Sequence, residues 1–152
     1  MFKTIVVGTD GSESAGVAVQ HATELAKLTG GTLHIVFAYR PLALSGVALA
    51  AGAGAATVDI QLVNQGIATE TEQICENAAS SARREGVAVV VHPIPGEPAD
   101  ALVGVAKDVG ADVVVVGNRG MSGPRRFVLG SVPNKVSHHC PCSLLIVDTA
   151  VD

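Results

Sequence analysis

The chain has 152 residues, enough for one domain with a sizeable buried core, and we expect a single domain over residues 1–152. Hydrophobic residues make up 48% and charged residues 16%, a balance typical of a globular protein with a large buried fraction. The net charge of −4 and the lack of a polybasic run argue against a nucleic-acid partner or a membrane-surface partner. The N-terminal stretch has no secretory signal pattern, and three cysteines make a poor disulfide framework, so we expect a cytoplasmic protein.

The first part of the chain alternates between strand and helix patterns. Phe2–Val7 is a β-branched run followed by the turn residues GTDGS, which predicts a strand and a loop. Small apolar residues then recur at three- and four-residue spacing from Ala15 to Ala26, which predicts a helix that ends at Gly30–Gly31. Thr32–Ala38 is nearly continuous in apolar character and is predicted to be a second strand covered on both faces.

Pro41–Val58 carries no charged residue, and its length alone is compatible with a membrane span. Gly and Ala fill most of it, and few of its residues are strongly apolar, so we reject that interpretation. We interpret it as a low-complexity loop that opens close to the end of a strand. It either lies over a bound ligand or is a plain connection.

The alternation continues to the end of the chain. The predicted elements are a helix from about Asp59 to Arg84, a strand Val87–His92, a turn-rich connection Pro93–Pro98, a helix closed by Gly110, a strand Asp112–Val116, a helix from about Val132 to His139 and a strand Ser143–Val147. Five strands alternating with helices predict an α/β fold, with a five-stranded parallel sheet and helices on both of its faces.

The stretch GNRGMSGPRRFVLGSV directly follows the fourth predicted strand and has the spacing Gly117-x2-Gly120-x9-Gly130-Ser131. Glycines let bare backbone N–H groups approach an anion, and we expect Ser131 to be the N-cap of the next helix, with Pro133 in its first turn. This arrangement is typical of a phosphate-binding loop, although a tight surface loop would also use such glycines. Should the first and fourth strands be neighbours, Asp10 would face this loop and offer its carboxylate to a ribose hydroxyl or a metal ion.

Two familiar nucleotide motifs are missing. No lysine follows the glycines as a Walker-type loop requires, and Gly8–Gly11 lacks the glycine spacing of a dinucleotide fingerprint. We therefore expect binding with at most slow ATP hydrolysis, assign no catalytic residue and leave enzyme activity open.

The remaining histidines and cysteines form one sequence cluster and several isolated positions. The run His138–Cys142 shows no second spaced ligand pair for a metal, so we interpret its histidines as the end of a helix and Pro141 as a break before the last strand. His21, His34 and His92 stand alone in helix or strand patterns and are expected to be surface or satisfied core residues.

The segments GTDGS, GEPADAL and VVGNRG…LGSV resemble those of the universal stress protein family, in its nucleotide-binding branch, and the resemblance covers essentially the whole chain. It implies strand order 3-2-1-4-5, the adenine-nucleotide alpha-hydrolase-like arrangement, and a homodimer formed through the C-terminal strand. It also implies a stress-response or signalling role and an adenine nucleotide, either AMP or ATP with Mg²⁺ or Mn²⁺.

Site residues follow from this resemblance by position. Thr9 and Asp10 would contact the nucleoside, Val36 and Ala38 would flank the adenine, and the ribose and phosphates would be held by Gly117, Arg119, Gly120, Gly130, Ser131 and Val132. The spacer MSGPRRFVL departs from the family pattern, which leaves the preferred nucleotide open, including a cyclic one. A nucleotide-independent homodimeric interaction module is the alternative function.

Overall fold

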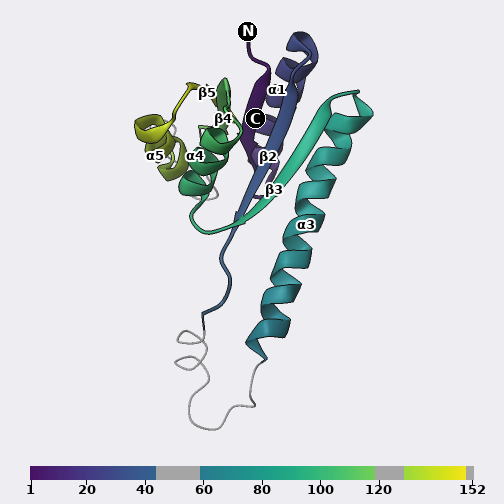
Figure 1. Ribbon diagram of the computed structural model, residues 1–152, viewed down its shortest axis with the longest axis vertical. Helices are drawn as coiled ribbons and strands as arrows, with labels where there is room; N and C mark the ends of the chain where they lie inside the picture. Colours follow the sequence, from purple (N-terminus) through teal and green to yellow (C-terminus); the bar gives the residue numbers. More distant parts are fainter. Residues whose placement is uncertain (44–58, 119–128, 150–152) are drawn as a thin grey trace.

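The computed structural model describes residues 1–43, 59–118 and 129–149. They form a five-stranded parallel sheet of order β3-β2-β1-β4-β5, with helices on both faces (Figure 1). The elements are β1 (Thr4–Gly8), α1 (Glu13–Thr29), β2 (Thr32–Tyr39), α3 (Ile60–Arg84), β3 (Ala88–Pro95), α4 (Pro98–Asp108), β4 (Val113–Gly117), α5 (Ser131–His139) and β5 (Ser143–Val147). The predicted fold class and strand order are confirmed. Most of the predicted loop Pro41–Val58, residues 44–58, lies outside the described residues.

The core has two layers because successive strand side chains point to opposite faces of the sheet. In β1, Ile5 and Val7 face the layer formed with α1 and α3, while Val6 faces the layer formed with α4 and α5. β4 repeats this alternation, with Val113 and Val115 in the first layer. All of these side chains are at most 2% exposed, which explains the nearly continuous valine run in β4.

The helix ends follow local sequence signals. The Ser12 hydroxyl accepts a hydrogen bond from the Ala15 N–H at 3.2 Å and caps the start of α1. Gly30 ends the same helix with φ +60°, a left-handed conformation that glycine adopts at little cost. Pro98 occupies the first position of α4, where a missing N–H does no harm.

The third strand is longer than predicted, so the expectation of a turn-rich connection from Pro93 is wrong in its first part. β3 continues to Pro95, which pairs with Tyr39. The Gly96 N–H donates to the Tyr39 carbonyl at 2.8 Å, so the alternate positions Pro93 and Pro95 direct their missing donors to the free side of this edge strand. An edge strand therefore accommodates prolines that a central strand would exclude.

No helix in residues 1–43, 59–118 and 129–149 is both long enough and apolar enough to cross a membrane.

Candidate functional site

A cavity opens at the carboxyl ends of β1, β2 and β4, with a volume of about 670 Å³ including its open mouth. β1 and β4 are hydrogen-bonded neighbours, with Ile5 opposite Val113, as the predicted meeting of the two loops requires. The chain runs from β1 outward to β3 and then returns to β4 on the other side, so the strand order reverses at this point. Ligands of open parallel sheets bind at such a reversal.

Six of the ten predicted site residues line this cavity: Thr9, Asp10, Val36, Ala38, Gly117 and Val132. Gly130 and Ser131 immediately precede Val132 at the start of α5 but are not among the lining residues. Arg119 and Gly120 lie outside the described residues. The structure therefore brings together predicted residues from four separate segments of the chain.

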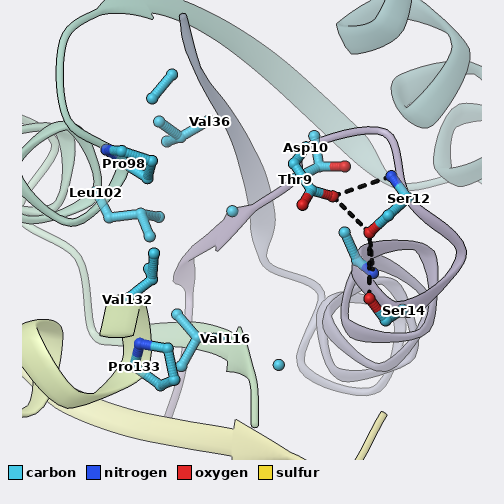
Figure 2. A pocket seen from close by; sticks show the side chains of 14 residues that line it. Thr9, Asp10, Ser12, Ser14, Val36, Pro98, Leu102, Val116, Val132 and Pro133 are labelled. Carbon is cyan, nitrogen blue, oxygen red and sulfur yellow. Dashed lines mark hydrogen bonds between the residues drawn. The ribbon is translucent and has the colours of Figure 1, made fainter. Parts of the chain in front are cut away.

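One wall of the cavity is apolar. Val36 from β2, Leu102 from α4 and Val116 from β4 lie along this wall (Figure 2), and each residue is at most 3% exposed. Ala38, also in β2, lines the cavity as well. The wall is held close to the first loop, because the Thr9 N–H donates to the Val36 carbonyl at 2.9 Å. Binding of a flat apolar group such as an aromatic base would be favourable here, because these side chains would bury its surface away from water.

The opposite side of the cavity is polar. The Asp10 carboxylate accepts hydrogen bonds from the Ser12 N–H at 2.9 Å and from the Ser12 hydroxyl at 2.5 Å. The Ser12 hydroxyl also lies 3.1 Å from the Ser14 hydroxyl, and the two contacts form the chain of dashed lines in Figure 2. These bonds fix Asp10 at the cavity edge with oxygen atoms as its neighbours, a chemistry suited to hydroxyl groups or to a hard cation.

Three helices begin at the cavity. Ser14 and Ala15 belong to the first turn of α1, Pro98 is the first residue of α4, and Val132 and Pro133 belong to the first turn of α5. Each helix N-terminus carries about half a positive charge on its free N–H groups, so this end of the cavity attracts an anion.

The start of α5 differs from the prediction, and the expectation of Ser131 as its N-cap is wrong. Gly130 is the N-cap, Ser131 is the first helical residue, and no side chain caps this helix. The Gly130 N–H donates to the Asn118 carbonyl at 3.0 Å, which fixes the glycine in the capping position. In α1 the Ser12 hydroxyl occupies one N-terminal donor, the Ala15 N–H, whereas α5 presents its first-turn N–H groups without a capping side chain.

Sequence reasoning did not select eight cavity residues: Gly8, Ser12, Ser14, Ala15, Pro98, Leu102, Val116 and Pro133. Several of them start helices that follow a strand, a position at which side chains lie near the carboxyl edge of the sheet. Leu102 gave no such signal, because only the packing of α4 on β1 brings it to the cavity. A methyl group added to Gly8 would lie 3.0 Å from the Leu102 side chain.

His34 and His92, isolated from each other in the sequence, lie outside the cavity and contact each other across β2 and β3. Their rings stack with centroids 5.2 Å apart, and His34 Nδ1 lies 3.0 Å from His92 Nε2, so one ring donates to the other. Burial lowers the pKa of both imidazoles, and the neighbouring His92 lowers that of His34 further. The pair is thus favoured in its neutral form.

The protein is thus an open parallel α/β fold with a cavity at its strand reversal, the position at which such sheets bind ligands. The sequence model of the universal stress protein family matches residues 1–148, so the chain belongs to this family. It is 33% identical over 147 residues to the universal stress protein YxiE of Bacillus subtilis, covering 97% of this chain and 99% of that protein.

Two solved structures of the family carry nucleotides. A universal stress protein in complex with cAMP is 33% identical, with a TM-score of 0.71 and coverage of 98% of both chains. The universal stress protein of Archaeoglobus fulgidus in complex with dAMP is 25% identical, with a TM-score of 0.63 and coverage of 95% of this chain and 97% of that chain.

Proposed function

We propose that this chain is a stress-response or signalling protein that binds an adenine nucleotide, ATP or AMP, and acts through binding rather than through fast catalysis. The observation that carries the proposal is the cavity itself, which joins an apolar wall to three helix N-termini at the strand reversal. The cAMP and dAMP complexes of related proteins support the adenine part of the proposal.

The two sides of the cavity suggest how the nucleotide lies. The base packs against Val36, Ala38 and Leu102, where burial of its rings is favourable. The phosphates lie at the uncapped start of α5, beside Gly130 and Ser131, because this N-terminus offers free N–H groups. Arg119 and Gly120 belong to the proposed phosphate side through the family resemblance alone.

Asp10 is the only carboxylate among the described residues that line the cavity. It would bind ribose hydroxyls directly or hold a Mg²⁺ or Mn²⁺ ion that arrives with ATP, since its surroundings supply oxygen donors. Removing the charge in D10N separates these roles. A ribose contact predicts weaker binding of AMP and ATP alike, whereas a metal contact predicts weaker binding of ATP only when Mg²⁺ is present.

Cyclic AMP is the second candidate ligand, and the cAMP complex at 33% identity favours it. The described lining contains neither lysine nor arginine, so helix N-termini provide the positive potential there. Such a site suits a phosphate group of low charge. Titration of nucleotide-free protein with cAMP, AMP and ATP, the last with and without Mg²⁺, ranks these ligands by calorimetry.

The decisive experiment is denaturation of the purified protein followed by mass spectrometry of any released nucleotide, together with the calorimetric titrations. The variant A38L should fill the apolar wall and reduce adenine-nucleotide binding, while A88L places the same side chain at an exposed position of β3, outside the cavity. Wild-type protein that releases no adenine nucleotide and binds none in titration would refute the proposal. Labelled ATP followed over time separates binding from slow hydrolysis.

A homodimer through β5 is a further part of the proposal. β5 is the outer strand of the sheet, and Leu145 and Ile146 are 41% and 39% exposed along it. An apolar edge strand favours pairing with another chain, which would also serve a nucleotide-independent interaction module. Sedimentation of the protein with and without nucleotide tests both the dimer and the nucleotide-independent interaction module. A monomer that dimerises only with nucleotide excludes the nucleotide-independent module, and a monomer in both states excludes the homodimer.

A further inference from the structure

Two cysteines meet where α5 gives way to β5. Cys140 is the C-cap of α5, Cys142 follows after Pro141, and their sulfur atoms lie 3.8 Å apart. Both are free thiols, half-buried against the layer of α4 and α5. Both sulfurs lie near the same carbonyl oxygen, that of Ser143, at 3.9 Å and 3.6 Å, so the two thiols converge on one side of the turn.

We propose that Cys140 and Cys142 form a two-thiolate site for a soft divalent cation, of the class of Zn²⁺ or Cd²⁺. The distance between the sulfurs matches this use. Two thiolates on a tetrahedral zinc ion, with Zn–S bonds of about 2.3 Å, are about 3.8 Å apart. A disulfide would require the sulfurs to approach to about 2.05 Å, so the ion needs less rearrangement of the turn than oxidation does.

The surroundings favour a cation over free thiolates. The last carbonyls of α5 direct partial negative charge toward Cys140, and this end of a helix stabilises cations and disfavours anions. Binding replaces the two S–H protons with one ion, M²⁺ + 2 RSH giving M(SR)₂ + 2 H⁺.

The site supplies two protein ligands. In the part of the chain that the structure describes, no three His, Cys, Asp or Glu side chains gather around one point, so water or another exchangeable ligand completes the coordination. His138 and His139, next in sequence, are exposed in the last turn of α5. A site with two open positions binds reversibly, as suits an ion that is exchanged rather than one that holds the fold together.

The site is separate from the cavity. Val132 and Pro133 line the cavity at the first turn of α5, and Cys140 ends the same helix. A helix of nine residues spans about 13 Å, so an ion at the dithiol does not touch a ligand in the cavity. Nucleotide binding and metal binding are thus measurable independently, and failure of one leaves the other standing.

The test uses Cd²⁺, because cadmium bound to thiolates gives an ultraviolet charge-transfer band. Fully reduced protein, with three free thiols confirmed by titration after denaturation, is titrated with Cd²⁺ while absorbance and proton release are followed. We expect the band to saturate at one ion per chain with release of two protons. C140S and C142S should each weaken Cd²⁺ binding at least about 100-fold, since even the loss of groups that only support a ligand costs 10–100-fold.

Cys75 provides the matched control. This third thiol is fully buried, so C75A should keep the band, and circular dichroism shows whether the variant has folded. C75S serves the same purpose if C75A unfolds. A band that persists in the double variant C140S/C142S, no band in reduced wild-type protein, or one ion shared by two chains would each overturn the proposal.

Discussion

A negative charge placed at the start of α5 should strengthen the fold and weaken nucleotide binding at the same time. Ser131 is the exposed first residue of this helix, whose first turn contains no acidic side chain. In S131D the new carboxylate lies at the positive end of the helix dipole and should stabilise the protein by about 0.3–1 kcal/mol. The same carboxylate would repel a phosphate bound to the neighbouring N–H groups.

The size of this repulsion follows from the expected proximity. Two unit charges about 5 Å apart repel by about 0.8 kcal/mol at the dielectric constant of water and by about 3 kcal/mol at an effective value of 20. The Kd for AMP or cAMP should therefore rise by a factor between about 4 and about 150. Calorimetric titration measures this change, and urea unfolding of the nucleotide-free protein measures the stability.

Ser137 offers a matched control on the same helix. It is exposed in the last turn of α5, about 9 Å farther along the axis, so S137D adds the same charge away from the proposed phosphate position. At this end of the dipole the carboxylate should destabilise the fold by a few tenths of a kcal/mol and leave the Kd unchanged. Equal Kd values for S131D, S137D and the wild type would refute the placement of phosphate at the start of α5.

Two further predictions concern stability. G31A should lower the free energy of unfolding by about 1–3 kcal/mol, because the added Cβ would lie 2.7 Å from the Lys3 carbonyl oxygen. G104A lies in the interior of α4, where the added Cβ would meet no neighbouring atom within 4 Å, and should raise the free energy of unfolding by about 0.5–1 kcal/mol. Equal midpoints of urea unfolding for the two variants would contradict this prediction. Because the folded pKa values of His34 and His92 lie below the ordinary 6.5, stability should be complete above that pH and decline as the pH falls through the folded values. The variant H34Q/H92Q should flatten this decline in unfolding measured between pH 7 and pH 5, and an unchanged slope would count against the pair as its source.

Much of the fold was predictable because its signals are local and repeated. The strand Ser143–Val147 has the predicted limits, since Pro141 separates it from α5 and β-branched or large apolar residues fill it. The start of α5 was harder, because both glycine and serine serve as N-caps, and only the bond from Gly130 to the Asn118 carbonyl decides between them.

The site was predictable where it depends on strand ends and unpredictable where it depends on packing. Thr9 and Gly117 adjoin the cavity because each lies at the carboxyl end of a strand, which the β-α alternation places on one edge of the sheet. Leu102 reaches the cavity from the middle of a helix, and the rotation of α4 on the sheet brings it there. His34 and His92 meet because β2 and β3 pair in a register that sets Val36 opposite His92, which no local pattern reveals.

The charge balance of the described cavity bears on which nucleotide it holds. Three helix N-termini supply about half a positive charge each, and Asp10 subtracts one, so this part of the site is far from neutralising the charge of free ATP. A cyclic phosphate carries a single negative charge, and the helix N-termini can compensate it without additional positive groups. ATP carries more negative charge and requires a cation such as Mg²⁺ or basic residues such as Arg119 beside its phosphates. The choice between ATP and cAMP is therefore a question of added positive charge more than of the adenine wall, because Val36, Ala38 and Leu102 would meet the same base in either ligand.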